Sequence, residues 1–221
     1  MVKHHNKAVI ITGIIGLITT VLVGFGEFLL HYDSLGRFGA GYEFLRGISD
    51  NRTTTGHFIG VLATPFYIVG FWHFMKMLEP ADKLWSRVAF AVMSYGIIIG
   101  NVWIGSRANI SAVINHENIS DAALLISLYE MRYEGLLFIM RLCLLVFSGI
   151  FVLLVLSGRS HYPKWVTFFN PIFLIFVAFA IWEAIPAIGN YLMPIGLNLA
   201  FGLLFLISIY FSNTLQEKQN E

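Results

Sequence analysis

Residues 8–31 read AVIITGIIGLITTVLVGFGEFLLH, a stretch whose ionisable side chains, Glu27 and His31, both stand near its end. A helix needs about 20 mostly apolar residues to cross the hydrocarbon core of a membrane. The stretch is too long and too polar at its end for a signal peptide, and no small-residue cleavage site follows it. We therefore expect residues 8–31 to form a membrane-spanning helix.

The composition of the whole chain points to the same class of protein. Hydrophobic residues make up 57% of the 221 residues and charged residues 12%, whereas a soluble domain carries about 25% charged residues. This excludes an ordinary soluble domain and a disordered chain. One Cys excludes a disulfide framework and a Cys-rich zinc site. A formal net charge of +1 gives no reason to expect nucleic acid as a partner.

Further apolar runs follow the first one along the chain. The sequence predicts an all-α polytopic membrane protein, a bundle of six transmembrane helices in a single transmembrane domain over residues 1–221. The expected spans are 8–31, 56–78, 84–108, 133–157, 164–188 and 191–211. Residues 32–55 are long for a bare loop and carry glycines among aromatic and apolar side chains, so we expect them to form an ordered outer cap.

The distribution of Lys and Arg predicts the orientation of the chain. Six spans place both termini on one side, and cytoplasmic loops carry an excess of Lys and Arg. The side of the termini would hold Lys3, Lys7, Lys76, Lys83, Arg87, Arg159, Lys164 and Lys218, and the opposite side Arg37, Arg46, Arg52 and Arg107. We therefore expect both termini to be cytoplasmic (N-in, C-in).

Most polar side chains within the expected spans fall near the outer ends, whereas the inner halves are apolar apart from His73 and Asn170. Residues three, four or seven apart share a face of a helix. Glu27 and His31 are thus one turn apart, above a stripe of Gly and Thr that favours close helix packing. The outer layer consists of Glu27, His31, His57, Asn101, Arg107, Glu130, Glu134, Arg141 and Glu183.

The charged side chains of this layer are expected to pair. A charge at membrane depth costs about 2.5–3.5 kcal/mol on insertion scales, so such side chains usually face the bundle. We expect Glu27 to pair with His31 or an arginine, and Glu134 with Arg141 or Arg107. The leading hypothesis is an outward-facing polar pocket that binds a small amphiphile or a lipid head group.

Each residue of the outer layer has an expected role in that pocket. Glu27 and His31 would form an acid–base or orienting pair, and Glu134 would tune Arg141 or act as a second acid–base group. In a membrane-embedded enzyme these three would be the catalytic residues. The residues expected to bind substrate are His57, Asn101, Arg107, Glu130, Arg141 and Glu183, with the two arginines holding an anionic group.

The sequence leaves other interpretations open, so it does not decide whether the protein is an enzyme. The outer layer could be a structural ion-pair network that reaches water by snorkelling, in a non-catalytic membrane subunit. It could also be the relay of a small-solute or proton-coupled transporter. A carrier needs polar groups that continue to the inner side, where His73 and Asn170 are the candidates. We expect His73 to be a packing residue and Asn170 to bond backbone freed by Pro171.

Cofactors and partners are weakly constrained by the sequence. No metal site is expected, because there is no HExxH motif and histidines are few. No phosphate-binding glycine motif is present, and the cofactor is unknown. The expected partners are the lipid bilayer and a lipid or small amphiphilic ligand, and a homo-oligomer is left open.

The first third of the chain carries the following residues: Gly26-Glu27-Phe28, His31, Glu43-Phe44-Leu45, Asp50, Gly56-His57, Pro65, Tyr67 and Trp72-His73. This set resembles an uncharacterised family of small bacterial integral membrane proteins with six spans. The resemblance implies a location in the bacterial cytoplasmic (inner) membrane. It carries no known activity, so it assigns no functional residue.

Overall fold

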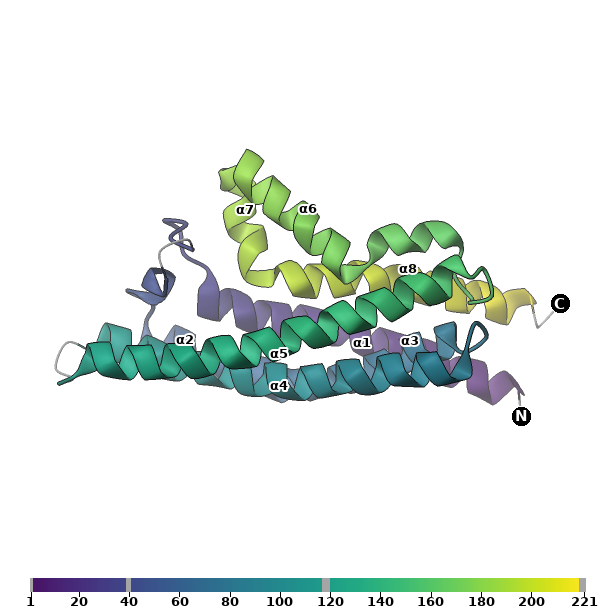
Figure 1. Ribbon diagram of the computed structural model, residues 1–221, viewed down its shortest axis with the longest axis horizontal. Helices are drawn as coiled ribbons and strands as arrows, with labels where there is room; N and C mark the ends of the chain where they lie inside the picture. The colour runs from purple at the N-terminus through teal and green to yellow at the C-terminus, as the bar shows by residue number, and fades with distance from the viewer. Residues whose placement is uncertain (1, 39–40, 117–119, 219–221) are drawn as a thin grey trace.

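The computed structural model describes residues 2–38, 41–116 and 120–218 and shows an all-helical protein (Figure 1). No strand occurs within these ranges. The elements, in chain order, are α1 (Val2–His31), η1 (Glu43–Leu45), α2 (Asp50–Ala63), η2 (Thr64–Phe66), α3 (Tyr67–Leu78), α4 (Lys83–Asn115), α5 (Ala122–Leu156), η3 (Lys164–Phe169), α6 (Pro171–Ala184), α7 (Pro186–Leu192), η4 (Met193–Ile195) and α8 (Gly196–Lys218).

Five helical segments in the described part of the chain are long and apolar enough to cross a membrane, as expected of an integral membrane protein. Helix α6 is apolar but shorter, with 14 residues. The five segments are Lys7–His31, Asp50–Leu78, Lys83–Asn115, Ala122–Leu156 and Pro186–Leu215.

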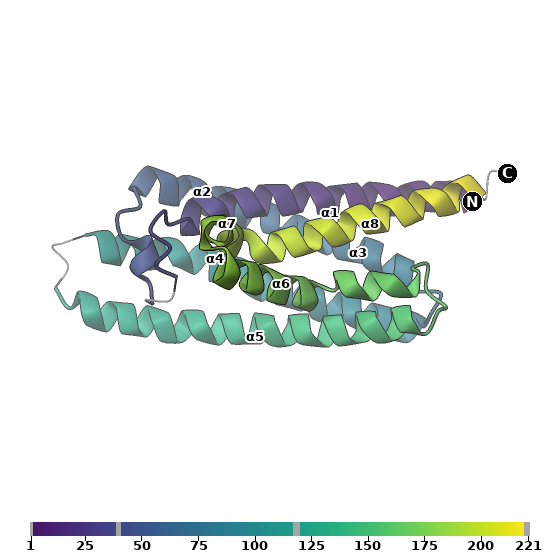
Figure 2. The same cartoon turned by 90° about the horizontal axis from the view of Figure 1, so that it is seen from above.

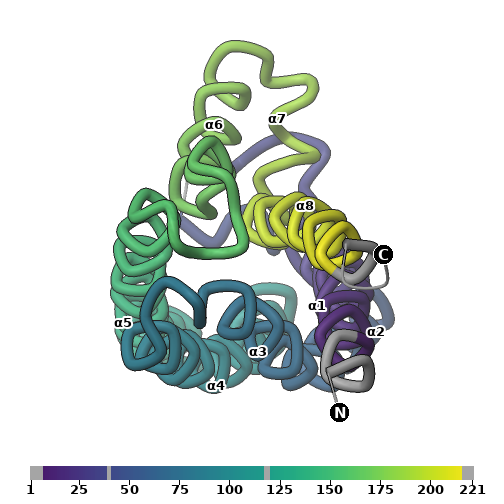
Figure 3. The backbone as a smooth tube through the Cα atoms, turned by 90° about the vertical axis from the view of Figure 1, so that its right-hand side faces the viewer, coloured from purple at the N-terminus to yellow at the C-terminus, as the bar shows by residue number. Residues whose placement is uncertain are grey.

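The long helices run along one common axis. Helix α1 begins and α8 ends at the same end of the bundle (Figure 1). At the opposite end, which we call the cap end, lie the α1–α2 connection, the end of α4 and the start of α5 (Figure 2). Seen along the axis, α1, α3, α4, α5 and α8 surround the interior, and the α6–α7 hairpin projects outward from them (Figure 3).

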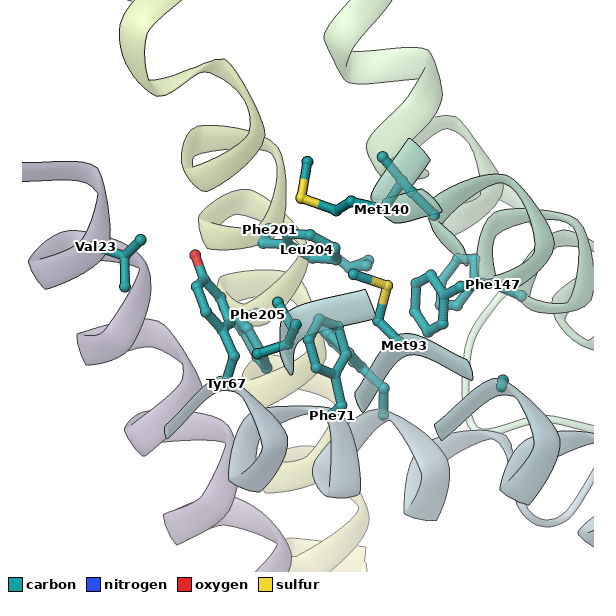
Figure 4. Packing of buried hydrophobic residues seen from close by; sticks show 14 of the residues in the cluster. Val23, Tyr67, Phe71, Met93, Met140, Phe147, Phe201, Leu204 and Phe205 are labelled. Atoms are coloured by element: carbon teal, nitrogen blue, oxygen red, sulfur yellow. The ribbon is translucent and has the colours of Figure 1, made fainter. Parts of the chain in front are cut away.

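Aromatic side chains fill the middle of the bundle. Phe71 and Phe74 of α3, Phe147 of α5, and Phe201 and Phe205 of α8 are almost completely buried (Figure 4). The rings of Phe74 and Phe205 are stacked with centroids 4.3 Å apart, and Phe71 meets Phe201 edge-on at 5.1 Å. Burial and ring geometry together stabilise this layer.

Helix α1 approaches α2 and α3 so closely that only glycine fits at the contacts. A Cβ on Gly26 would lie 2.7 Å from the backbone nitrogen of Gly60 and 2.9 Å from the carbonyl oxygen of Gly56. A Cβ on Gly70 would lie 2.7 Å from the Cα of Gly16. Gly16 belongs to the predicted stripe of Gly and Thr on α1, so that stripe serves close packing, as its spacing indicates.

The helix expected over residues 164–188 is divided into three pieces, which corrects that expectation. Asn170 has ψ of 134° and Ile185 has φ of −139° and ψ of 74°, so neither continues a helix. Each precedes a proline, and the proline ring disfavours helical backbone in the residue before it. The side chain of Asn170 accepts a hydrogen bond from the Ile172 backbone N–H at 2.9 Å and so caps α6.

The cap is shorter than expected and is tied to the bundle. Helix α2 begins at Asp50, so residues 32–49 remain as the connection. The Gly47 backbone N–H donates to the Oδ1 of Asn115 at 2.7 Å, and Asn115 Nδ2 donates to the Leu45 carbonyl at 2.9 Å. Arg37 pairs with Asp33 at 2.8 Å and holds the pKa of that carboxyl below its usual value. Gly39, expected in the cap, lies outside the described residues, as do the side chains of Lys3 and Lys218.

Candidate functional site

A buried arginine on α4 lies at the centre of a polar cluster towards the cap end. Arg107 is only 4% exposed. Its Nη1 lies 2.5 Å from Nδ1 of His31 on α1, and its Nε donates to the Tyr133 hydroxyl of α5 at 2.9 Å. The guanidinium carbon is 3.4 Å from the ring centroid of Trp103, one turn earlier on α4. Stacking on an aromatic face suits the planar, weakly hydrated guanidinium.

Glu27 connects this arginine to α3 and α8. Its Oε1 is 3.7 Å from Arg107 Nη1, and its Oε2 accepts from Asn198 Nδ2 at 2.5 Å. The Tyr67 hydroxyl donates to Asn198 Oδ1 at 2.7 Å. Five helices therefore meet in one connected set of buried polar groups. We call this set the arginine network: Glu27, His31, Tyr67, Trp103, Arg107, Tyr133 and Asn198.

The contact with Arg107 fixes the proton on His31. A guanidinium can only donate, so the Nδ1 of His31 must accept and the proton of the neutral ring is on Nε2. Within the described ranges this Nε2 has no hydrogen bond of good geometry, although the Pro194 backbone lies close to the ring. The indole Nε1 of Trp103 is likewise buried without a partner among the described residues. The network thus contains two buried N–H donors that are not used within it.

A cavity of about 210 Å³ borders the network on its α5–α6 side. One wall is polar and comes from Glu27, His31, Trp103 and Arg107. The remaining lining, apart from Arg141, is apolar, and we call it the apolar wall. It comes from α5 and α6 (Leu137, Met140, Leu144, Ile175, Ala178 and Phe179) and from η4 and the start of α8 (Met193, Pro194, Gly196 and Leu197). Arg141 also lines the cavity and is exposed, as is Phe179, so the cavity reaches the surface between α5 and α6.

The structure brings together part of the predicted outer layer. Glu27, His31 and Arg107 meet in the network, and Glu27 pairs with an arginine, one of its two expected partners. Glu27 and His31, the expected acid–base pair, are not hydrogen-bonded to each other. Arg107 contacts each of them instead. Arg141 lines the same cavity without joining the network.

The other predicted site residues lie elsewhere. Glu130, Glu134 and Glu183 are exposed and do not line the cavity. His57 and Asn101 are half-buried and also lie outside the cavity lining. The ring of His57 lies against α4 near Gly105.

Four residues of the arginine network were not predicted as site residues from the sequence. Tyr133 stands beside Glu134, and the helical stripe of Leu137, Met140 and Leu144 that it begins could have placed it inside. Asn198 is a lone amide in an apolar run, which is itself a signal of a buried polar contact. Tyr67 and Trp103 read as ordinary aromatic residues of the spans, and no sequence signal separates them from the rest.

A second polar cluster lies nearer the end of the bundle where α1 begins and α8 ends, and its members hydrogen-bond to one another and to the Val9 carbonyl. Nδ1 of His73 lies 2.7 Å from the Val9 carbonyl oxygen and must donate to it, so its Nε2 accepts from the Ser208 hydroxyl at 2.5 Å. Ser208 lies 2.6 Å from the Tyr162 hydroxyl, which therefore donates to it. His73 is fully buried with both ring nitrogens bonded, as expected for a packing residue.

No three His, Cys, Asp or Glu side chains come close enough to hold a metal ion in the part of the chain that the structure describes. The site itself holds buried hydrogen-bond donors, one ion pair and an exposed arginine.

Comparison with known proteins places the chain in a family. No curated protein and no solved structure matches it. A family model described as a family of unknown function matches residues 2–215, nearly the whole chain, which confirms the expected uncharacterised family. The chain belongs to this family of unknown function, DUF6796.

Proposed function

We propose that the cavity between α5 and α6 binds an amphiphile, with its polar head against the arginine network and its apolar tail against α5 and α6. The observation that carries this proposal is the division of one cavity into a polar wall and an apolar wall. Ligand sites are typically concave and apolar with a few convergent polar groups. An opening between two lipid-facing helices would admit a molecule directly from the bilayer.

Binding fits the network better than acid–base catalysis by Glu27 and His31. A general base needs a free lone pair within reach of the proton that it removes. Arg107 occupies the Nδ1 lone pair of His31. Asn198 donates to one oxygen of the Glu27 carboxylate, and Arg107 lies 3.7 Å from the other. Both residues are thus held in place by other side chains, and Glu134 is exposed and does not line the cavity.

Binding also fits better than transport through the bundle. Along α8, Phe201 and Phe205 separate Asn198 of the arginine network from Ser208 of the second cluster, and both rings are almost completely buried. A proton or solute path needs polar groups along its length, and these two rings offer none. The second cluster uses its donors and acceptors internally.

We further propose six passes with both termini on the cytoplasmic side of a bacterial inner membrane. Helix α6 rises only about 21 Å, and η3 before it would complete the fifth pass. An even number of passes fits the shared end of α1 and α8 (Figure 1). The expected excess of Lys and Arg at that end supports its cytoplasmic placement.

This orientation predicts which engineered cysteines are labelled on intact cells. In a Cys143→Ala background, Leu35→Cys in the exposed cap should react with a membrane-impermeant maleimide. Arg159→Cys, which is exposed between α5 and η3, should react only after the cells are opened. The reverse pattern would overturn the orientation, and labelling of both on intact cells would overturn the six passes.

The binding proposal predicts that a bulky side chain on the apolar wall displaces the amphiphile. Ala178 lines the cavity, whereas Ala180, two residues later on α6, is exposed and does not line it. We expect Ala178→Trp to lose the amphiphile that co-purifies with the wild type, because the indole would fill the cavity. Native mass spectrometry of protein released from mild detergent measures what stays bound.

Ala180→Trp is the matched control, since it adds the same side chain to the same helix. It should retain the amphiphile at the level of the wild type. Equal retention by both variants would contradict a site in this cavity, as would a wild type that carries no bound amphiphile.

A further inference from the structure

We propose that the amphiphile bound in this cavity carries a head group that is a hydrogen-bond acceptor with a single negative charge, such as a carboxylate or a phosphodiester. The inference rests on the proposed function and specifies the ligand class of the same site. It follows from two independent properties of the cavity lining: the unused hydrogen-bonding groups of the polar wall and the unpaired charge of Arg141.

The unused groups of the polar wall are donors. His31 carries Nε2–H and Trp103 carries its indole N–H, and both residues line the cavity while being more than nine-tenths buried. Neither N–H has a well-formed hydrogen bond in the described ranges. A buried donor without a partner is costly, so an oxygen that accepts from both would gain affinity. The one carboxylate on this wall, Glu27, is already bonded to Asn198 and paired with Arg107.

The charges around the cavity leave one positive charge without a counterion. Glu27 and Arg107 cancel, and His31 is neutral by its contact with Arg107. Arg141 lines the cavity, and among the described residues no carboxylate lies within ion-pair distance of it. The exposed carboxylates of this end, Glu130, Glu134 and Glu183, are not part of the lining.

A single anionic head group matches both properties at once. Its oxygens would accept from His31 and Trp103 at the inner wall, and its charge would be balanced by Arg141 near the surface. Charge-assisted hydrogen bonds are stronger than neutral ones, and charges interact more strongly near the membrane interior than in water. A neutral head group would satisfy the donors only, and a zwitterionic one would bring an ammonium group for which the lining offers no free carboxylate.

The test compares ligands that share a tail and differ in the head group. Binding to purified protein in a nonionic detergent is measured for oleate and oleyl alcohol, and for dioleoyl phosphatidylglycerol and dioleoyl phosphatidylcholine. We expect the anionic member of at least one pair to bind about tenfold more tightly than its partner, a difference of about 1.4 kcal/mol. Preference within the first pair identifies a free fatty acid as the source, and preference within the second identifies a phospholipid.

Arg141 provides the variant that should remove this preference without unfolding the protein, because it is exposed and makes no ion pair among the described residues. Arg141→Gln should bring the anionic ligand close to its neutral or zwitterionic partner. Arg132→Gln, an exposed arginine on the same helix outside the cavity lining, should leave the preference unchanged.

The two proposals fail in different ways. Equal affinity for oleate and oleyl alcohol, and for the two phospholipids, with all binding lost in Ala178→Trp, would overturn the anionic head group and leave the amphiphile site standing. Binding that Ala178→Trp does not weaken, or no binding of any of the four probes, would overturn the site itself.

Discussion

Replacing Arg107 with methionine should lower the free energy of unfolding by about 3–5 kcal/mol, because removing one partner of a buried ion pair leaves the other charge uncompensated. Glu27 would remain buried with Asn198 as its remaining hydrogen-bond partner among the described residues. The Tyr133 hydroxyl and the Nδ1 of His31 would lose their donor as well. Reversible unfolding of the purified protein in mixed micelles, followed by circular dichroism, measures the loss.

Two further variants show that this loss comes from the charge and not from the shape of the side chain. Arg132→Met makes the same replacement at an exposed position on α5 and should change stability little. Glu27→Gln combined with Arg107→Met removes both charges and should recover most of the loss, since no uncompensated charge stays buried. If Arg107→Met were no more harmful than Arg132→Met, the arginine network would not hold the bundle together.

The second large effect is expected from a single methyl group on α1. Gly26→Ala would place its Cβ 2.7 Å from the Gly60 nitrogen and 2.9 Å from the Gly56 oxygen. These are backbone atoms, which cannot move aside as a side chain can. Helices α1 and α2 would have to separate, and we expect a loss of about 3 kcal/mol, the upper part of the range for overpacking. The same unfolding measurement applies.

Gly135→Ala is the matched control, because a Cβ there would meet no atom within 4 Å. Ala is the better helix former, so this variant should be as stable as the wild type or more stable by up to about 1 kcal/mol. Because Glu27 follows Gly26 in the chain, separating α1 from α2 should also shift Glu27 relative to Arg107. Gly26→Ala as stable as Gly135→Ala would show that the two helices are not in such close contact.

Hydropathy was enough to predict the helical bundle but not the breaks in it. The run at 164–188 is apolar throughout, and Pro171 and Pro186 stand near its ends. Hydropathy carries no information on backbone dihedral angles. Helical backbone is disfavoured in the residue before each proline, and α6 is therefore short. The 3₁₀ turn at Thr64–Phe66, which contains Pro65, interrupts the second segment more mildly because the backbone on both sides remains helical.

The sequence predicted those residues of the candidate site whose charge requires a partner within the membrane. Glu27, His31 and Arg107 are ionisable groups on apolar helices, and lipid forces such groups towards the interior. Helical phase did not identify the buried face of α5, because that helix is apolar on most of its circumference. Charge pairing predicts that Glu134 and Arg141 face the bundle, whereas in the structure Tyr133 is buried and both Glu134 and Arg141 are exposed. Which hydroxyl or amide meets Arg107 depends on packing between helices, and one sequence does not specify it.

The most direct measurement is a density map of the wild-type protein in lipid nanodiscs. We expect elongated density between α5 and α6, along Leu137, Ile175 and Phe179, ending in a head group against His31 and Trp103. A cavity closed by the side chains of α6, with lipid density confined to the outer faces of the helices, would contradict it.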